Sequence, residues 1–582
     1  MKKSPSQISL SYFLPKTIIG QCLKVFTPLI DRLLGIKQLQ KMYLNNGFEG
    51  LEKQVFTLKL LQLLGVTVEG ESELINKVPK SGRFIVVCNH PYGMIEGVII
   101  ARLLTSIRAD TKVMANVGLS LFKEIQDYFI FANPLNPKAT INQQAIKSCF
   151  THLQNDGLLV IFPAGSVSSF QKDKQVICDA PWNRLSASLA KKTKTPVLPL
   201  FITGQNSHRF HQLGVIYYRF RLMMLIREMF KLKGKVIQLL SNDIIPVAQF
   251  EHFNSTQHLN DYLRLQCYLN QSKVITKTLP HQQKPIQSEQ DVKQIHQELN
   301  ALPTKNNLVN YRHFSVYYAQ HEQIPITLKE ITRLREITFR GQHEGSGLEC
   351  DSDEFDKTYT HLFVFDHQAG KIVGAYRMGR TDKLLKQGGL SALYLSQIFQ
   401  FKEEAFNLQS PCLELGRSFI SPAYQNSFYA LLLLWKGICA FAYLHPQYRT
   451  LYGTVSLSQN YQPLSITLMN KTLNQHTASI KPHHEYENIE NIELNAYFKK
   501  YTVTLPLLSS LIKGLEEDNK EVPILLKHYH KMGGNFHALG IDKQFNKTPG
   551  FLLSVDLATA PDKLLNLYFG KQQKISYQAY RD

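Results

Sequence analysis

Short, continuous apolar runs bounded by glycine, proline or asparagine recur through the first half of this 582-residue chain. Three of them span residues 84–88, 158–162 and 197–202. An uninterrupted apolar run of this length suits a strand that is buried on both faces, as in a parallel sheet. Segments with helical spacing separate the runs. The pattern therefore predicts an α/β layer structure.

The second half of the chain again mixes strand and helix patterns. Residues 361–365 and 372–377 indicate neighbouring strands joined by a turn at 366–370, and residues 413–419 indicate another strand. Residues 427–443 are largely apolar and have the length of a buried helix. We expect a second α/β structure here.

The chain is too long for one hydrophobic core, because domains usually contain about 100–250 residues. Residues 271–305 are polar and glutamine-rich, which is typical of a linker with room for a short exposed helix. The predicted organisation is an N-terminal helical segment (1–60), a first domain (61–270), the linker (271–305) and a second domain (306–582).

The charge of the chain is strongly positive, with 66 lysines and arginines against 46 acidic residues and a formal net charge of +20. This excess suits an anionic membrane surface or an acidic carrier protein, although a solvated basic surface has the same composition. Apolar and basic residues alternate at helical spacing in 1–60 and 216–235, which fits either core helices or membrane-surface helices. Because no run reaches the ~18 apolar residues of a spanning helix, we expect a peripheral protein without a transmembrane helix.

The sequence lacks the patterns of metal sites and of nucleic-acid-binding modules. Its eight cysteines are scattered, without the paired spacing of a zinc site or a small disulfide framework. No helix-turn-helix, zinc finger or aromatic-basic sheet pattern accompanies the positive charge. We therefore expect reduced thiols, no bound metal and no nucleic-acid partner.

A first chemical motif lies at residues 88–97, which read Cys-Asn-His-Pro-Tyr-Gly-Met-Ile-Glu-Gly and follow an apolar run. His90 is followed six residues later by Glu96, across a Pro/Gly turn that can bring the two side chains together. A carboxylate there holds the imidazole tautomer and stabilises its protonated form, so that the histidine can take a proton from a hydroxyl. The same residues also fit a plain turn with a hydrogen-bonded histidine.

Three further blocks follow in order, at residues 161–168 (Ile-Phe-Pro-Ala-Gly-Ser-Val-Ser), 179–182 (Asp-Ala-Pro-Trp) and 195–200 (Thr-Pro-Val-Leu-Pro-Leu). Together with the His90 block, they resemble the lysophospholipid acyltransferase family. The resemblance is closer to the branch that acylates lyso-ornithine lipids, and it covers residues 75–245. It implies a glycerolipid-acyltransferase-like layer fold.

This resemblance also implies roles for individual residues. His90 is the general base that deprotonates an acceptor hydroxyl for attack on an acyl thioester, and Glu96 orients it. The acceptor pocket is lined by four residues: Phe162, Pro163, Gly165 and Ser166. Backbone N–H groups in that block stabilise the oxyanion. The sequence departs from the family at Glu96, where aspartate is usual, and at Met94, where glycine is usual.

A second ordered set of residues lies in the second half of the chain: Arg335, Asp353, Asp356, Arg377, Glu414 and Arg417. In this order they resemble the N-acyltransferases that make lyso-ornithine lipid. Those enzymes are relatives of the acyl-homoserine-lactone synthases within the GNAT-like superfamily. The resemblance covers residues 310–575 and implies a GNAT-like fold.

The second resemblance implies an amine site. Glu414 is the base that frees the amine, directly or through a water, because an ammonium group is not a nucleophile. Arg377 and Arg417 hold charges or a buried carboxylate network, and Asp353 and Asp356 bind the amino substrate or order a loop. Arg335 belongs to the same substrate-binding set.

The expected acyl donor is a thioester of acyl carrier protein, with coenzyme A as the alternative. GNAT enzymes that use coenzyme A carry a glycine-rich loop after the fourth strand, where backbone N–H groups bind a pyrophosphate. Here residues 425–430 read Gln-Asn-Ser-Phe-Tyr-Ala, with phenylalanine in place of the first glycine. An acidic carrier also suits the net charge of +20. We expect no tightly bound cofactor.

Together, the motifs predict a bifunctional acyltransferase on the cytoplasmic face of the bacterial inner membrane. The second domain joins a 3-hydroxyacyl chain to the amine of an amino acid, with ornithine as the first choice. The first domain then esterifies the 3-hydroxyl of this lyso-aminolipid. The alternatives are a lysophospholipid acyltransferase with a degenerate second domain and a non-catalytic basic membrane-binding or lytic protein.

Overall fold

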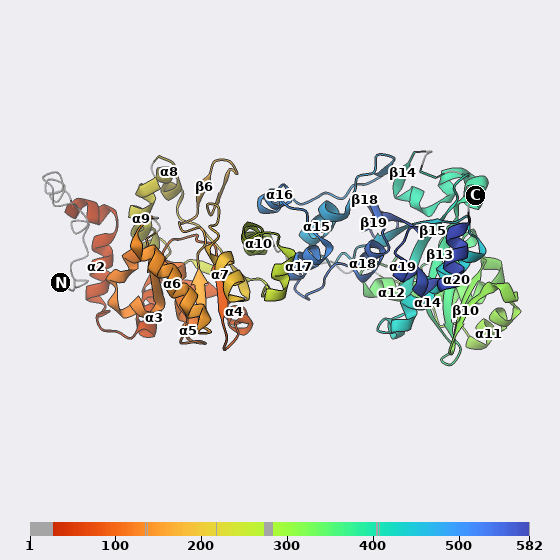
Figure 1. Cartoon of the computed structure of the whole chain (residues 1–582), viewed down its shortest axis with the longest axis horizontal. Coiled ribbons are helices and arrows are strands. Elements are labelled where there is room, and N and C mark those ends of the chain that lie inside the picture. Colours follow the sequence, from red (N-terminus) through yellow and green to blue (C-terminus); the bar gives the residue numbers. More distant parts are fainter. Residues whose placement is uncertain are drawn as a thin grey trace. The chain divides into compact units, whose positions relative to one another are not determined.

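The computed structural model describes residues 27–133, 136, 138–216, 218–272, 283–402, 405–406 and 408–580. The described chain forms two compact units (Figure 1). Unit 1 contains the described residues up to 272 together with Glu490–Thr502 and Lys513–Leu515, and unit 2 contains the other described residues. Each unit mixes helices and strands, which confirms the predicted α/β class. Residues 1–26 of the predicted N-terminal helical segment lie outside the described residues.

Unit 1 is built on a seven-stranded sheet of order β1-β9-β8-β2-β5-β3-β4. Its strands are β1 (Thr67–Glu69), β2 (Phe84–Cys88), β3 (Lys112–Asn116), β4 (Phe129–Ala132), β5 (Leu158–Ile161), β8 (Val197–Ile202) and β9 (Val236–Ser241). Neighbouring strands are parallel except β8 and β9. The three apolar runs of the sequence are β8, β2 and β5, which lie side by side and are buried throughout.

Helices and one short hairpin complete unit 1 (Figure 1). The helices are α2 (Ile36–Asn45), α3 (Lys53–Leu64), α4 (Glu71–Lys77), α5 (Ile95–Thr105), α6 (Thr140–Gln154), α7 (Leu185–Thr193), α8 (His208–Ile216), α9 (Tyr218–Phe230) and α10 (Thr256–Leu269). The hairpin pairs β6 (Ser169–Gln171) with β7 (Val176–Cys178). Tyr43 of α2 and Phe56 of α3 are buried in the core, whereas Leu44 and Leu58 of the same helices are exposed.

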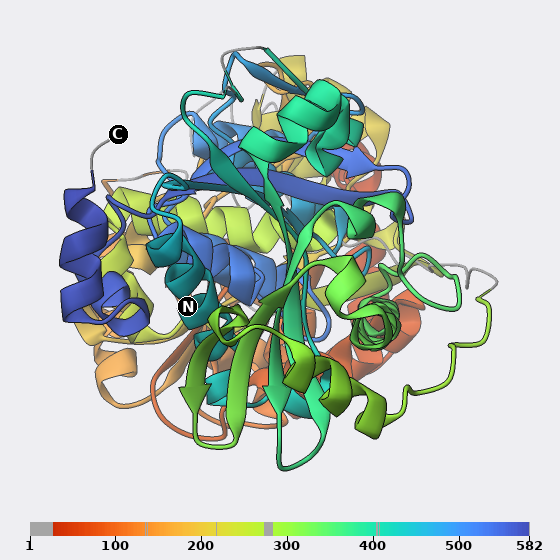
Figure 2. The ribbon, with the colours of Figure 1, turned by 90° about the vertical axis from the view of Figure 1, so that its right-hand side faces the viewer.

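Unit 2 is built on an eight-stranded sheet of order β10-β11-β12-β13-β15-β16-β19-β18. Its strands are β10 (Asn307–Tyr311), β11 (Phe314–Ala319), β12 (Thr360–Asp366), β13 (Lys371–Arg380), β15 (Cys412–Ile420), β16 (Thr450–Ser456), β18 (Asn535–Asp542) and β19 (Thr548–Asp556). The predicted strands at 361–365, 372–377 and 413–419 fall within β12, β13 and β15. Figure 2 shows the twist of the sheet, with its green and dark blue strands running in different directions.

One strand pair in this sheet is parallel and it separates part-way along. β15 pairs with β16 only from Cys412 to Leu415, opposite Thr450 to Gly453, and all other neighbours are antiparallel. The two strands come very close at Gly453, where a Cβ atom would lie 2.6 Å from the carbonyl oxygen of Leu415. Beyond this point the register ends, although both strands continue. A shift in the β13–β15 register and a positive φ of 48° at Arg417 accompany the change, as at a β-bulge.

The helices of unit 2 pack around this sheet. They are α11 (Val292–Ala301), α12 (Pro325–Gly341), α13 (Thr381–Gly388), α14 (Phe428–Leu444), α15 (Pro463–Leu473), α17 (Leu505–Leu515, of which the last three residues belong to unit 1), α18 (Ile524–Lys531), α19 (Asp562–Tyr568) and α20 (Lys571–Ala579). A small sheet pairs β14 (Phe399–Phe401) with β17 (Ile480–Pro482). α14 is the predicted buried helix at 427–443. Its Gly437 lets it approach the sheet, because a Cβ atom there would lie 2.5 Å from Val316.

The structure differs from the predicted domain limits in two places. Residues 292–301 of the predicted linker form α11, which belongs to unit 2 because Ile295 and Leu299 are buried in its core. Residues 490–502 of the predicted second domain pack with unit 1. There α16 (Ile492–Phe498) places Glu493 against Arg264 of α10. The sequence did not predict these two assignments, because α11 has only a short apolar pattern and the ion pair between α16 and α10 joins residues far apart in the chain.

None of the helices in the described parts of the chain combines the length and the apolar character needed to cross a bilayer.

Replacing Arg264 with alanine is expected to destabilise unit 1 by about 1–3 kcal/mol, because Glu493 and two buried carbonyls lose their hydrogen bonds while Lys174, 2.8 Å from Glu493, still balances its charge. Arg264 contacts both oxygens of Glu493, at 2.8 and 2.9 Å, and donates to the carbonyls of Asp179 and Ala180. Urea unfolding of the full chain checks this. Lys500→Ala is the control, because Lys500 forms an exposed pair with Asp261 that is worth about 0–1 kcal/mol. Equal urea midpoints for the Arg264→Ala and Lys500→Ala variants would contradict a stabilising role of Arg264.

Candidate active sites

His90 and Glu96 lie together just beyond the carboxyl end of β2. Nδ1 of His90 is 2.9 Å from Oε1 of Glu96, whose side chain is fully buried, whereas 19% of the His90 side chain is exposed. Asn89 fixes the start of this loop, because its side-chain amide exchanges two hydrogen bonds with the backbone of Ile202 at the end of β8. The predicted pair is therefore formed, with its imidazole partly open to solvent.

The turn between the two residues holds the Glu96 carboxylate. The backbone N–H groups of Tyr92, Gly93 and Met94 donate to it at 2.9, 2.7 and 3.1 Å. Glu96 stands in the first turn of α5, so its longer side chain folds back over the helix start. This geometry explains how glutamate occupies a position where aspartate is usual.

Electrostatics in this pair favour a protonated imidazole beside an ionised carboxylate. Burial acts to lower the pKa of His90, but the charge and the hydrogen bond of Glu96 outweigh it, so the pKa is raised. Burial likewise acts to raise the pKa of Glu96, and His90 and the N–H of Gly93 outweigh that effect and lower it. Such opposite shifts are typical of a general base with an orienting carboxylate.

Asp179 supports the backbone on either side of His90. Its Oδ1 accepts the N–H of His90 at 3.1 Å and the hydroxyl of Ser168 at 2.5 Å, and its Oδ2 accepts the indole N–H of Trp182 at 2.9 Å. The N–H of Ser168 donates to the carbonyl of His90. Asp179 and Trp182 thus position the loop. Their place in one sequence block, at residues 179–182, does not by itself reveal this role.

The predicted pocket residues lie at the carboxyl end of β5, next to His90. The ring of Phe162 is 4.6 Å from the His90 ring, centroid to centroid. Gly165 adopts a positive φ of 64°, and its N–H donates to the carbonyl of Phe162, while Pro163 accepts from Asn183. Ser166 is exposed. The Gly165 N–H is thus used inside the turn and does not point an unused donor at the site.

A small apolar pocket adjoins the turn between His90 and Glu96. Its lining includes residues of α2, α3 and α9 and of the turn itself: Leu39, Tyr43, Phe56, Met94, Ile95 and Met229. Met94, which stands where glycine is usual, therefore serves as a pocket wall. A pocket with so few polar groups suits a hydrocarbon chain.

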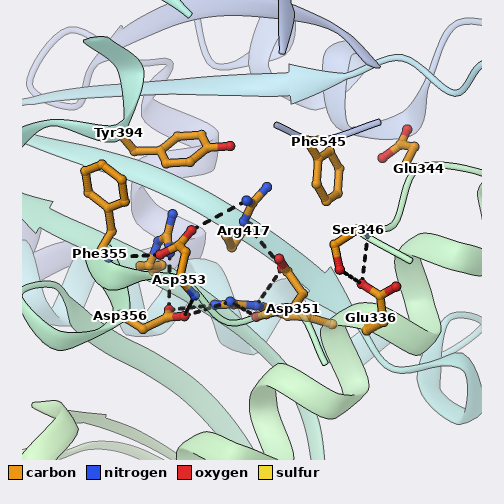
Figure 3. A network of polar contacts seen from close by, with 12 residues as sticks. Glu336, Glu344, Ser346, Asp351, Asp353, Phe355, Asp356, Tyr394, Arg417 and Phe545 are labelled. Atoms are coloured by element: carbon orange, nitrogen blue, oxygen red, sulfur yellow. Dashed lines mark hydrogen bonds and ion pairs between the residues drawn. The ribbon is translucent and has the colours of Figure 1, made fainter. Parts of the chain in front are cut away.

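In unit 2 the predicted arginines and aspartates form one buried network (Figure 3). Arg335 of α12 contacts Asp351 and Asp356, both at 2.9 Å. Arg377 of β13 contacts Asp353 and Asp356. Arg417 of β15 contacts the carboxylates of Asp351 and Asp353, at 3.3 and 3.5 Å. Three positive and three negative side chains thus alternate, so their charges balance.

The network also orders the loop between α12 and β12. Asp353 caps a short 3₁₀ turn at Glu354–Lys357 by accepting the N–H of Phe355, and Asp356 accepts the N–H of Asp353 in return. Burial acts to raise the pKa of Asp356, but Arg335 and Arg377 hold it well below its usual range. Asp351 was not assigned a role from the sequence, although its place two residues before Asp353 was a usable signal.

Aromatic rings enclose the guanidinium of Arg417. It lies 4.8 Å from the ring centre of Tyr394 and 4.4 Å from that of Phe545, as in cation–π contacts. Phe545 follows β18, and Arg417 stands where β15 leaves β16. The network therefore reaches the point at which the sheet divides.

Glu414 lies on β15 within the paired part of the sheet and is 2% exposed. Its Oε2 accepts the hydroxyl of Tyr359 at 2.6 Å, and its Oε1 accepts the N–H of Leu395 at 2.9 Å. Burial raises the pKa of Glu414 to about 7, against these hydrogen bonds. Both carboxylate oxygens are thus engaged within the protein. Tyr359 has no signal in the sequence, because only the fold brings it to Glu414.

Across the described ranges, no group of three or more histidines, cysteines, aspartates or glutamates has the arrangement of a metal site.

Two family models match the chain, one in each half. Residues 31–275 match a model described as an acyltransferase, and residues 334–436 match one described as an acetyltransferase (GNAT) domain. The first range contains His90 and Glu96, and the second contains Arg335, Asp353, Asp356, Arg377, Glu414 and Arg417. Each model thus encloses one of the two sites.

Curated relatives of two kinds are similar to the chain. A glycine N(alpha)-acyltransferase of Bacteroides thetaiotaomicron is 33% identical over 165 residues, which cover 26% of this chain and 49% of the relative. A glycine N(alpha)-acyltransferase of Phocaeicola vulgatus is 31% identical, covering 29% of this chain and 55% of the relative. A lyso-glycine lipid O-acyltransferase of B. thetaiotaomicron is 26% identical over residues that cover 33% of this chain and 71% of the relative.

The chain therefore spans about half the length of the glycine N-acyltransferases that it matches. The matches to N- and O-acyltransferases agree with the presence of two separate sites. The chain thus carries an acyltransferase domain in its first half and a GNAT domain in its second half.

Proposed function

We propose that the chain is a bifunctional synthase of an acylated amino-acid lipid. Unit 2 joins a 3-hydroxyacyl chain to the amine of an amino acid, and unit 1 then esterifies the 3-hydroxyl with a second acyl chain. The observation that carries this proposal is that one chain contains both a His90–Glu96 pair and a buried arginine–aspartate network at a divided sheet. One kind of curated relative is named for N-acylation of glycine, and the other is named for O-acylation of a lyso-glycine lipid.

Unit 1 has the groups needed for ester formation. Glu96 occupies Nδ1 of His90, which leaves Nε2 to take the proton of the attacking hydroxyl. The hydroxyl oxygen forms an ester bond with the acyl carbon as the carbon–sulfur bond of the thioester breaks, and the imidazolium gives its proton to the leaving thiolate. The apolar pocket beside Met94 would hold a hydrocarbon chain of one substrate.

Unit 2 has a place for a thioester where β15 and β16 separate. Backbone N–H groups released there from strand pairing are donors for the thioester carbonyl. The network would hold the acceptor, with Arg417 next to the opening and Arg335, Arg377, Asp353 and Asp356 fixing it from behind.

We propose glycine as the amino acid, ahead of the ornithine expected from the sequence. Two N-acyltransferase relatives and two O-acyltransferase relatives are all named for glycine. The network offers a guanidinium for one carboxylate, which glycine supplies without a further side chain to accommodate.

We also propose that the protein works at an anionic membrane surface and takes its acyl chains from acyl carrier protein. Exposed apolar side chains recur on the N-terminal helices and on α8: Leu29, Leu33, Leu44, Val55, Leu58, Leu63, Leu213 and Val215. With a net charge of +20, such helices suit the interface of anionic lipids. In unit 2, the Ser427 side chain caps α14 by accepting the N–H of Tyr429. One backbone N–H group at the start of this helix thus has a partner within the protein, which favours a donor other than the pyrophosphate-containing coenzyme A.

His90→Ala is expected to stop the second step only. Loss of a general base costs about 10²–10⁴-fold in rate, so cells producing the variant should accumulate the single-chain lyso-aminolipid. Mass spectrometry of extracted lipids measures both species. His252→Ala, an exposed histidine of the same unit, is the control and should give the double-chain lipid. If wild type produces no aminolipid but acylates lysophospholipid, the alternative of an ordinary lysophospholipid acyltransferase holds.

The pH dependence of O-acylation is expected to follow His90. Because its pKa is raised, the neutral form that acts as a base gains population only above the ordinary histidine value of about 6.5. The rate should therefore rise with pH through a pKa above that value. In the Glu96→Gln variant, burial becomes the main influence on the pKa of His90 and lowers it. The rise of the rate with pH should therefore occur at lower pH, while the maximal rate falls. An unchanged limb would exclude His90 as the titrating group.

N-acylation should prefer the carrier-protein donor. The expected result is a higher kcat/KM with 3-hydroxyacyl carrier protein than with the coenzyme A thioester of the same chain. The carrier rate should also fall with added salt, because the attraction is between opposite charges. Assays with glycine and ornithine in competition identify the head group from the product mass. Equal use of both donors, without salt dependence, would remove the support for a carrier partner.

A further inference from the structure

Glu344 is a buried carboxylate that neither the motifs nor the network accounts for. It lies three residues after the end of α12 and is 5% exposed. Its Oε2 accepts the hydroxyl of Ser456 at 2.7 Å. Ser456 is the last residue of β16, three positions beyond Gly453, where the pairing with β15 ends. The Glu344 carboxylate therefore lies next to the part of β16 that no longer pairs with β15.

The charge of Glu344 has no basic partner among the described residues. Its neighbour Glu336 is paired with Arg340 at 2.7 Å and accepts three further hydrogen bonds from Ser346 and Gly347. The three aspartates of the network are each held by arginines. Burial raises the pKa of Glu344 to about 7, and the Ser456 hydroxyl opposes this only in part. A buried carboxylate in this state favours binding of a cation.

The loop of Glu344 is joined to the network through the loop of Phe545. The side-chain amide of Asn546 donates to the carbonyl of His343, which joins the loop of Glu344 to the loop of Phe545. The Phe545 ring in turn lies 4.4 Å from the guanidinium of Arg417. Figure 3 shows this order, with Phe545 between Arg417 and Glu344. In this view the Phe545 ring thus separates the Glu344 carboxylate from the guanidinium of the network.

We propose that Glu344 binds the ammonium group of the acceptor amino acid and takes its proton. This rests on the proposed N-acylation by unit 2. One proton passes from the ammonium to Glu344, and the amine nitrogen attacks the thioester carbon. The carbon–nitrogen bond forms as the carbon–sulfur bond breaks. The second proton of the nitrogen passes to the leaving thiolate, and Glu344 releases its proton to solvent.

This assignment separates Glu344 from Glu414. Both oxygens of Glu414 are engaged by Tyr359 and Leu395, whereas the structure gives one hydrogen-bond donor for Glu344, the Ser456 hydroxyl. Glu414 then acts as a positioning residue. It holds Tyr359, whose hydroxyl accepts the N–H of Tyr394, the residue that stacks on Arg417.

Other titratable groups near Glu344 are engaged with different partners. Tyr461 is close enough for Glu344 to raise its pKa, and its hydroxyl donates to the carbonyl of Glu521. Lys520 lies 5.0 Å from the Tyr461 ring and pairs with Glu516 at 3.2 Å. The proton-accepting group on this side of the opening is thus Glu344.

The test compares wild type, Glu344→Gln, Glu414→Gln and Glu349→Gln in the full chain, with glycine and a 3-hydroxyacyl carrier-protein donor. Glu349 is an exposed carboxylate of the same loop and is the matched control. The kcat/KM for glycine is measured from pH 6 upward, with product identified by mass. Glu344→Gln is expected to lower it by about 10²-fold or more at neutral pH. Circular dichroism and thermal unfolding confirm that each variant is folded.

The shape of the pH profile distinguishes a base from a structural residue. Wild type should rise through a pKa near 7 and then level, because Glu344 must be ionised. Glu344→Gln should lose this limb and rise steadily with the fraction of uncharged amine, so that its deficit shrinks at high pH. Glu414→Gln should keep the limb at a lower rate, and Glu349→Gln should match wild type.

The outcomes separate the two levels of the proposal. If wild type yields N-acyl product and Glu344→Gln keeps its rate and its limb, the role of Glu344 is refuted while the proposed function stands. If the limb disappears in Glu414→Gln instead, Glu414 is the base, as the resemblance implies. If wild type acylates no amino acid, the proposed function fails and the role of Glu344 fails with it.

Discussion

Both candidate sites depend on where the pairing of parallel strands ends. In unit 1, β8, β2 and β5 are parallel, so their carboxyl ends meet at one edge and bring the loops of His90 and Phe162 together. In unit 2, β15 and β16 are the one parallel pair in an otherwise antiparallel sheet of described residues, and they separate after Leu415 and Gly453. A parallel pair needs no shared turn at its end, so the strands can separate there and leave backbone groups for a substrate.

The two units stabilise buried charge in different ways. In unit 1, three consecutive backbone N–H groups and one imidazole surround the Glu96 carboxylate. In unit 2, guanidinium groups from α12, β13 and β15 hold three aspartates of one loop. Burial of ions is costly unless each is paired with good geometry. The alternation of three arginines and three aspartates meets this condition and ties the loop between α12 and β12 to the sheet.

The proposed order of reaction runs against the order of the domains. An N-acylated product with one chain is amphiphilic and would stay at the membrane surface, where the first domain can reach it. Joining the two activities in one chain raises the effective concentration of the intermediate at the second site. The matched relatives are each named for one step. In the proposed bifunctional chain, the intermediate would be formed and used by the same molecule.

The sequence by itself determined the α/β class, the three central strands of unit 1, β12, β13, β15 and α14, because continuous or alternating apolar runs encode burial directly. It also selected His90, Glu96 and most of the ion-pair residues, because their order along the chain carries the resemblance to the two acyltransferase families. Only the tertiary structure brought Asp179, Asp351 and Tyr359 into the sites and assigned α11 and α16 to their units. It likewise revealed Glu344, whose partner Ser456 lies 112 residues away. These contacts join segments distant in sequence, and no local periodicity records which strand ends will meet.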